Sequence, residues 1–437
     1  MEGASGGAEA SRLEASPVDG LRSLPVPLRG WLAAKFLSDT GSALNLIVLG
    51  IYALEVLASA TALGVLLALR LGGTVLGGAI APRLAKLKGN RALMIAADLS
   101  SAALVLMLVV TPQAFHAALL FPLVALLGIC HGAFHVALFA EVPTFVGQRR
   151  RHALNAALSA IDGLGIVLGG LLAAILTAAW SYDAIFALNA ASYAVSGLVL
   201  LALGTRLPRR TPESEGTATK GSDVPAAHPG RAIGRLRALL RTAAIALPLL
   251  LLVRFGEAFG SAAHNVGFPI LSERFDPTAP AMLYGLVMAA WGGGRLVAAS
   301  FVPHLYGRLE VRGTRLDAIF VATVIATFAM FVGVFALAPL AAILVAATLA
   351  GVFDTATETA YYSILQSAPD DQRTALVSVS YVVERGGMGI GMIGVGALFA
   401  TAGLLEGVLA YYGAGIALAV VVLVLLHMRS REERTSP

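Results

Sequence analysis

The second half of this chain repeats the first half. Lys35-Phe36, followed after four residues by Gly41-Ser42-Ala43, returns 219 positions later as Arg254-Phe255 and Gly260-Ser261-Ala262. At an offset of 222, a second set of matches pairs Arg151, Ala153, Leu154, Asp162, Gly165 and Gly169 with Arg373, Ala375, Leu376, Glu384, Gly387 and Gly391. Because the offset stays nearly constant over separate segments, we expect two halves that fold alike.

The composition places both halves in a membrane. Charged residues make up only 13% of the chain, whereas a soluble domain carries about 25%. Charge-poor runs of about 20 residues, each long enough to cross a bilayer as a helix, recur along the chain. Twelve runs, called spans 1 to 12 here, start near Gly30, Ala60, Ala92, Ala114, His152, Ala184, Ala243, Ala281, Leu316, Leu340, Thr374 and Gly407.

These spans predict the fold class and favour a function. Backbone polar groups in lipid need internal partners, and the runs lack the alternation of β-barrel strands. We therefore predict an all-α membrane protein with twelve transmembrane helices in two pseudo-symmetric six-helix bundles. A duplicated chain of this kind favours a transporter, because two similar bundles can rock about one central site and expose it to each side in turn.

The basic residues indicate the topology. Lys and Arg gather in the connections after even-numbered spans, whereas only Arg274 lies on the other side. Since positive residues mark the cytoplasmic face, we expect a multi-pass protein of the cytoplasmic membrane with both termini in the cytoplasm. The net charge of +5 then follows from topology, and no nucleic-acid partner is expected.

The domain boundaries follow from the same pattern. We expect a disordered N-terminal tail over 1–27, a bundle over 28–204, a cytoplasmic linker over 205–242, a second bundle over 243–428 and a C-terminal tail over 429–437. The linker is rich in Pro, Ser, Thr and Gly as far as Pro229, which predicts disorder. Between Arg231 and Arg241 the pattern fits either a short helix on the membrane surface or a solvated linker end.

Charges inside the spans identify a predicted pathway for substrate or protons. A charge at mid-bilayer costs roughly 2.5–3.5 kcal/mol and is kept where it faces protein or water. Spans 1, 4, 7 and 10 carry most of these polar residues, which are Lys35 and Asp39, His131 and His135, Arg254, Glu257 and His264, and Asp354, Glu358 and Tyr361. We therefore expect the first helix of each three-helix unit to line a central cavity.

The roles of these charges stay open in part. The charged pairs of spans 1 and 7 can form salt bridges within their own helices, in a structural or gating role. Asp354 and Glu358 lie one turn apart without a cation on their helix. Because like charges favour protonation of one partner, this pair is our first candidate for proton coupling and Asp39 the second. The alternative for Asp354 and Glu358 is pairing with basic loop residues at an inner gate.

Four further basic side chains lie within spans. His131 and His135 are one turn apart, but no third zinc ligand is near in sequence, so a proton relay, a substrate contact, or a packing or gating role remain open. Arg70 and Arg295 have no acid on their own helices. Either can meet an anionic substrate group or an acid on a neighbouring helix. We predict no metal and no cofactor.

Small residues form matching stripes in spans 5 and 11. The pairs are Gly165 with Gly169 and Gly387 with Gly391, each at a spacing of four. Small residues allow helices to approach closely, so we expect these stripes at the interface between the two halves. The chain also lacks the Gly-x4-Gly-Lys-Ser/Thr pattern of a P-loop, so energy must come from an ion gradient or a partner.

Several short motifs resemble those of a known family. They are Phe36-Leu37-Ser38, Leu69-Arg70-Leu71, Ala96-Ala97-Asp98-Leu99, and Glu141-Val142-Pro143 followed by Arg149 and Asn155. With twelve spans in two repeats, the chain resembles the major facilitator superfamily, and within it the drug and siderophore exporters similar to the enterobactin exporter and macrolide efflux pumps. It departs from the family pattern at Pro82, which occupies an aspartate position, and at Ile166, which replaces a proline.

The resemblance implies a proton-coupled efflux pump, an antiporter of the multidrug-resistance type, for an amphipathic drug, secondary metabolite or siderophore. It also implies an inner gate in which Glu141 pairs with Arg83 or Arg91, and we add Glu384 and Arg385 to this gate. We expect a monomer whose partners are the small-molecule substrate, protons and the lipid bilayer. An importer with the same fold and a non-transporting sensor remain alternatives. An enzyme is the weakest alternative, because the sequence shows neither a nucleophile with a base nor a metal set.

Overall fold

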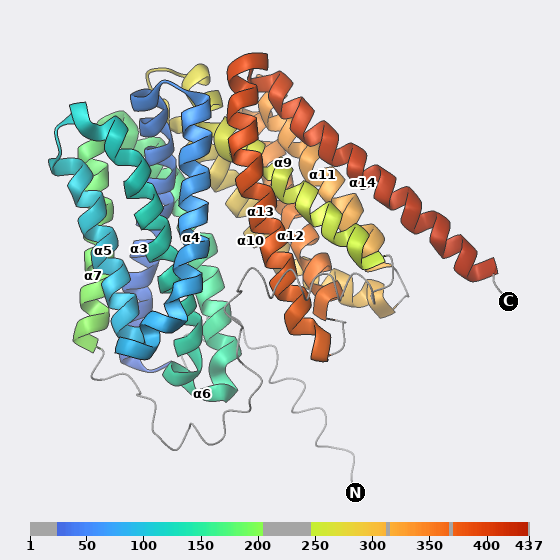
Figure 1. The fold of residues 1–437 in the computed structure, drawn as a ribbon, viewed down its shortest axis with the longest axis horizontal. Coiled ribbons are helices and arrows are strands. Elements are labelled where there is room, and N and C mark those ends of the chain that lie inside the picture. Colours follow the sequence, from blue (N-terminus) through green and yellow to red (C-terminus); the bar gives the residue numbers. More distant parts are fainter. Residues whose placement is uncertain (1–23, 204–245, 312–314, 367–369, 436–437) are drawn as a thin grey trace, which may run out of the picture.

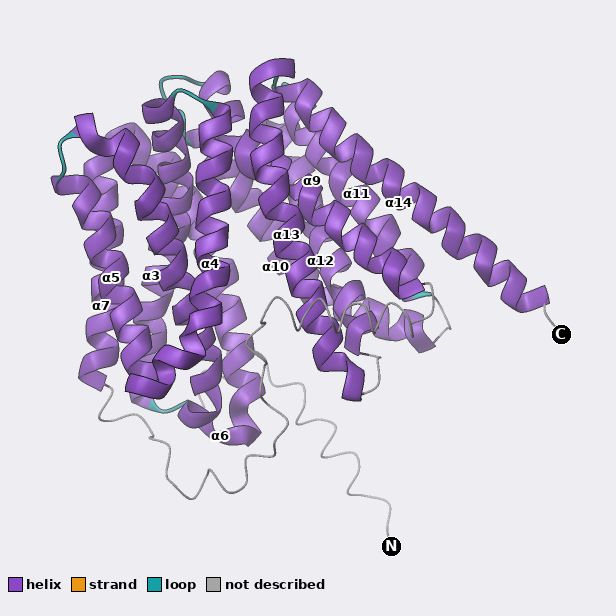
Figure 2. Cartoon of the chain, in the orientation of Figure 1, coloured by secondary structure: helices purple, strands orange, loops and turns teal. Residues whose placement is uncertain are grey.

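The structure, a computed structural model, describes residues 24–203, 246–311, 315–366 and 370–435. All regular secondary structure in these ranges is helical (Figure 2). The first half contains α3 (Val26–Leu57), α4 (Ala60–Lys88), α5 (Asn90–Val110), the 3-10 helix η2 (Gln113–Phe115), α6 (His116–Ala179) and α7 (Tyr182–Leu203). The second half contains α9 (Ala246–Phe275), α10 (Met282–Val311), α11 (Leu316–Ala336), α12 (Leu340–Gln366), α13 (Asp370–Ala402) and α14 (Leu404–Thr435).

The described helices account for the predicted spans. Among the described residues, eleven segments are long and apolar enough to cross a membrane. Two of them, Gln113–Val146, which includes η2, and Ala157–Ala179, lie along α6. The remaining predicted span corresponds to α9, which is long enough but carries Arg254 and Glu257 in its middle. The chain is thus a multi-pass membrane protein. Figure 1 shows two bundles side by side, with α3 to α7 in one and α9 to α14 in the other, as the repeat predicts.

Glycines allow equivalent helices to pack closely in each half. In the first half, a Cβ at Gly128 of α6 would overlap the carbonyl oxygen of Arg70 on α4. In the second half, a Cβ at Gly351 of α12 would overlap the carbonyl oxygen of Trp291 on α10. Since only glycine permits such a distance between backbones, the duplicated sequence imposes the same helix contact twice.

The predicted glycine stripes lie at helix contacts, but not between the halves. Gly165 and Gly169 of α6 pack against α3, and Gly387 and Gly391 of α13 pack against α9. Each stripe therefore fixes a contact within one bundle, and the expectation that these glycines lie at the interface between the halves is wrong. Spacing alone identified a close helix contact but could not identify the partner helix.

Other glycines bring the two halves together. A Cβ at Gly170 of α6 would lie 2.5 Å from the carbonyl oxygen of Gly285 on α10. On the other flank, Gly64 of α4 packs against the backbone of Met392 on α13. These contacts lie near the start of α4 and α10, which we call the converging end. Figure 1 shows the bundles separating toward the opposite, diverging end, where α7 ends and α9 begins.

Some predictions concern residues outside the described part of the chain. The linker prediction for 205–242, including the surface helix between Arg231 and Arg241, falls within the undescribed range 204–245. Most of the predicted tail over 1–27 falls within another undescribed range, 1–23, and α3 begins at Val26. The last candidate span ends at Met428, and α14 continues to Thr435, within the range expected as a C-terminal tail.

Candidate functional site

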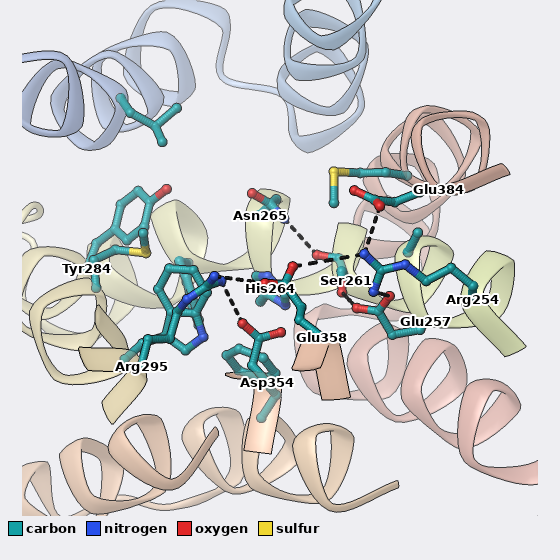
Figure 3. A pocket seen from close by; sticks show the side chains of 17 residues that line it. Arg254, Glu257, Ser261, His264, Asn265, Tyr284, Arg295, Asp354, Glu358 and Glu384 are labelled. Atoms are coloured by element: carbon teal, nitrogen blue, oxygen red, sulfur yellow. Dashed lines mark hydrogen bonds and ion pairs between the residues drawn. The ribbon is translucent and has the colours of Figure 1, made fainter. Parts of the chain in front are cut away.

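A cavity of about 210 Å³ lies mainly within the second half. Its walls come from α9, α10, α12 and α13, while α3 contributes Leu46 and α11 contributes Phe331 (Figure 3). Six of its lining residues are charged, namely Arg254, Glu257, Arg295, Asp354, Glu358 and Glu384. Five of these were predicted as pathway or gate residues, and Arg295 was predicted to meet either a substrate or an acid.

Arg254 is the centre of the first charged cluster. Its guanidinium donates to Glu257 at 2.8 Å on the same helix and to Glu384 of α13 at 2.7 Å. Glu358 of α12 lies 3.9 Å away, and the ring of Tyr361 lies under the guanidinium at 5.2 Å. The expected intrahelical pair is therefore present, and the same arginine also joins α9 to α12 and α13.

Arg295 is the centre of the second cluster. It donates to Asp354 at 2.7 Å and to Glu358 at 3.0 Å, both on α12. The two carboxylates therefore share a cation from the neighbouring helix α10. The pairing with basic loop residues that the sequence left open is not the arrangement observed among the described residues. Glu358 lies between both arginines, so it links the two clusters.

Aromatic side chains form part of the remaining cavity wall. His264 accepts or donates a 2.9 Å hydrogen bond through Nδ1 with the hydroxyl of Tyr412, and its ring stacks on Phe331 at 4.2 Å. Trp291 lies under Arg295 at 4.9 Å. Tyr284 also lines the cavity, and its ring lies 3.7 Å from where a Cβ of Gly50 on α3 would be. Sequence reasoning missed Trp291 and Tyr284, although each lies on the helix that carries Arg295.

Tyr361 supports the cavity from outside its wall. Its hydroxyl donates to Ser380 at 2.7 Å, and the side chain is buried. It does not line the cavity. Its contact with the Arg254 guanidinium indicates that it positions this arginine rather than a ligand.

The predicted pathway residues of the first half form separate contacts. Lys35 pairs with Asp39 at 2.6 Å and lies 5.6 Å above the ring of Phe134. His131 and His135 pack ring to ring at 4.4 Å. None of these residues lines the cavity of the second half. The two halves therefore carry related polar positions but different electrostatic arrangements.

Of the two arginines expected to pair with Glu141 in the predicted inner gate, one does so. Arg91 of α5 donates to Glu141 of α6 at 2.7 Å and stacks on Phe145, whereas Arg83 is exposed. The partner of Glu141 is therefore Arg91. In the second half, Glu384 holds Arg254 in the cavity, and Arg385 lies 3.8 Å from Glu384 and over the ring of Tyr381.

The cavity charges define what this site can do. The cavity wall contains two arginines and four carboxylates. Arg385, beside Glu384, is a third cation near these carboxylates. Burying excess negative charge is costly, so the site favours binding a cation, including a proton. The aromatic wall offers apolar surface beside these charges, as small-molecule sites commonly do.

Solved structures with the same fold are transporters. The nucleoside transporter NupG is 12% identical, with a TM-score of 0.70, over 91% of this chain and 98% of that one. A D-xylose-proton symporter is 14% identical, with a TM-score of 0.67, over 90% and 95%. A bacterial homologue of the human lysosomal transporter Spinster, in an inward-facing and occupied conformation, is 15% identical, with a TM-score of 0.65, over 92% and 95%.

No curated protein matches this chain in sequence. The sequence profile of the Major Facilitator Superfamily matches residues 31–337, which is most of the chain. Together with the two six-helix bundles and the polar cavity, this match indicates a secondary transporter of small molecules rather than an enzyme. The chain belongs to the Major Facilitator Superfamily.

Proposed function

We propose that this transporter is a proton-coupled exporter of an amphipathic small molecule in the cytoplasmic membrane. The observation that carries the proposal is the position of Arg295 between Asp354 and Glu358, at 2.7 and 3.0 Å. The three groups lie in one cavity beside aromatic side chains. A carboxylate that exchanges an arginine for a proton can couple proton movement to a change in helix packing.

The proposed step has a simple charge balance. With Arg295 bound, both carboxylates are ionised and share one cation. When α10 moves relative to α12, the guanidinium leaves one carboxylate, and a proton from the more acidic side binds to the freed oxygen. Release of that proton on the other side allows Arg295 to return. Alternating access between two bundles supplies the required movement.

The orientation of the proposal follows the charge pattern. The diverging end contains the end of α7 and the start of α9, and the basic connections of the sequence belong to the same side. Because basic loops mark the cytoplasmic face, the cavity would receive substrate from the cytoplasm, with both termini on that side. The resemblance to drug and siderophore exporters supports the outward direction.

Import is the second candidate function. It is favoured by one observation, which is the similar fold of a D-xylose-proton symporter. The same charge exchange serves either direction, so the direction must come from a transport measurement. A non-transporting sensor is a third possibility, in which the cavity acids would tolerate neutral substitution.

The test is proton-driven efflux in a pump-deficient bacterium supplied with a panel of dyes and antibiotics. We would compare the wild type with Asp354→Asn, Glu358→Gln and the control Asp276→Asn, whose carboxylate lies in the exposed turn after α9. One proton moving down a gradient of one pH unit can support about a tenfold concentration ratio of substrate.

We expect the wild type and the Asp276 variant to lower accumulation, an uncoupler to abolish this effect, and both cavity variants to lose it. Equal efflux by the cavity variants would exclude Asp354 and Glu358 from coupling. Higher accumulation with the wild type than without the protein would establish import instead.

A further inference from the structure

Arg70 is an arginine in the middle of a membrane helix. It is the eleventh residue of α4 (Ala60–Lys88), which places it about 15 Å from the start of the helix and near the centre of a bilayer about 30 Å thick. The residue is half-buried. A cation at this depth costs roughly 2.5–3.5 kcal/mol by insertion scales, so its position needs a compensating interaction.

The described part of the chain offers Arg70 no carboxylate. Lys35, Arg254 and Arg295 each pair with an acid at 2.6 to 2.8 Å. The guanidinium of Arg70 forms neither a hydrogen bond nor an ion pair with a described side chain. Its electrostatic neighbours are the hydroxyls of Tyr193 and Tyr284 and the ring of His131. Of Arg70 and Arg295, only Arg295 pairs with an acid of a neighbouring helix among the described residues.

The position of Arg70 is fixed at the seam between the halves. Gly128 of α6 packs directly against its carbonyl oxygen, so the backbone cannot shift toward α6. The next residue, Leu71, lies 3.8 Å from where a Cβ of Gly389 on α13 would be. A change in the packing of α4 against α13 would therefore alter the surroundings of Arg70 directly.

The two tyrosines that interact electrostatically with Arg70 belong to different halves. Tyr193 belongs to α7 of the first half, and its hydroxyl accepts a 2.9 Å hydrogen bond from Ser42. Tyr284 belongs to α10 of the second half and lines the cavity (Figure 3). Met288 and Trp291 continue the cavity wall from Tyr284 along the same helix, and Arg70 lies outside this wall.

We propose that Arg70 binds a carboxylate of the transported molecule, so that the substrate is an amphipathic organic anion. The inference rests on the proposed transport function and specifies its substrate class. A guanidinium matches a carboxylate with two parallel hydrogen bonds. The apolar body of the substrate would lie against the aromatic wall.

The experiment measures binding to the purified full-length protein in lipid nanodiscs by equilibrium dialysis, with empty nanodiscs to subtract partition into lipid. The probes are 1-naphthylacetate and 4-phenylbutyrate, each compared with its neutral carboxamide. The variants are Arg70→Gln, Arg70→Lys and the control Arg83→Gln, which removes an exposed arginine outside the cavity. Arg70→Gln removes an unpaired charge and leaves no acid without its cation, so it should fold; thermal unfolding checks this.

We expect the wild type and Arg83→Gln to bind at least one acid about tenfold more tightly than its amide, since a charge-assisted hydrogen bond is stronger than a neutral one. Arg70→Gln should lose this preference while binding the amide unchanged, and Arg70→Lys should keep part of it. Equal binding of acid and amide by the wild type, an acid preference that survives in Arg70→Gln, or no binding of any probe would overturn the inference.

Efflux of neutral or cationic dyes in the panel described above, with no acid preference in the binding assay, would retain the exporter and remove the anion site. The two proposals can therefore fail separately.

Discussion

The contact between Gly170 and Gly285 makes a specific prediction about alternating access. These glycines bring α6 and α10 together at the converging end. A Cβ at Gly285 would overlap the carbonyl oxygen of Gly170 and lie 2.8 Å from the backbone nitrogen of Ala174. Because the obstructing atoms belong to the backbone, a side-chain rotation cannot relieve the overlap. Gly285→Ala should therefore push the halves apart at this end.

The magnitude follows from the cost of overpacking. Inserting a methyl group into a well-packed contact costs about 1–3 kcal/mol. The cost falls on the conformation with a closed converging end and is absent where α6 and α10 separate. The population ratio of the two conformations should then change about 5-fold to 150-fold. Gly293→Ala is the matched control, because it lies on the same helix and a Cβ there meets nothing within 4 Å.

The assay is double electron–electron resonance between spin labels at the converging end. Labels would replace the exposed residues Trp180, after α6, and Leu337, after α11, in a background in which the single cysteine, Cys130, is serine. Gly285→Ala should add a population at longer distance, whereas Gly293→Ala should leave the distribution unchanged. An unaltered distribution in Gly285→Ala, with the protein folded, would refute the assignment of this contact to the closed state.

Two ion pairs give further predictions. Exchanging Arg91 and Glu141, which lie 2.7 Å apart, should restore at least part of the transport lost in each single charge reversal; a swapped variant no more active than the single variants would contradict this pairing. Arg254→Met should lower the stability of the folded protein by about 3–5 kcal/mol, because it leaves Glu257 and Glu384 without their buried cation. Adding Glu257→Gln and Glu384→Gln should recover most of the thermal unfolding temperature, and failure of this rescue would show that packing rather than charge explains the loss.

The similarity between the halves does not extend to their charges. Both halves pair a basic residue with an acid on the first helix, Lys35 with Asp39 and Arg254 with Glu257. Among the described residues, only the pair of the second half is joined to further helices, through Glu384 and Glu358. A duplicated fold therefore presents an acidic cavity in one half and a separate set of basic groups in the other. The two halves can then bind groups of opposite charge.

The sequence by itself determined the fold class and the intrahelical contacts. Hydropathy predicts the spans because lipid forces every backbone polar group into a helix. The pairs of α3 and α9 follow from residues three or four positions apart on one helix face. The nearly constant offset also predicted two equivalent bundles. Each of these inferences depends on interactions that are local along the chain or repeated at a fixed distance.

Only the tertiary structure decided which helices meet. The sequence could not assign Arg295 to Asp354 and Glu358, because these residues lie on different helices and many pairings satisfy the same charges. It likewise placed the stripe of Gly165 and Gly169 between the halves, where the structure has Gly170 and Gly285 instead. A one-residue step turns a position about 100° around a helix, so adjacent glycines face different partners. Contact partners therefore depend on how the helices rotate and pack, which hydropathy does not specify.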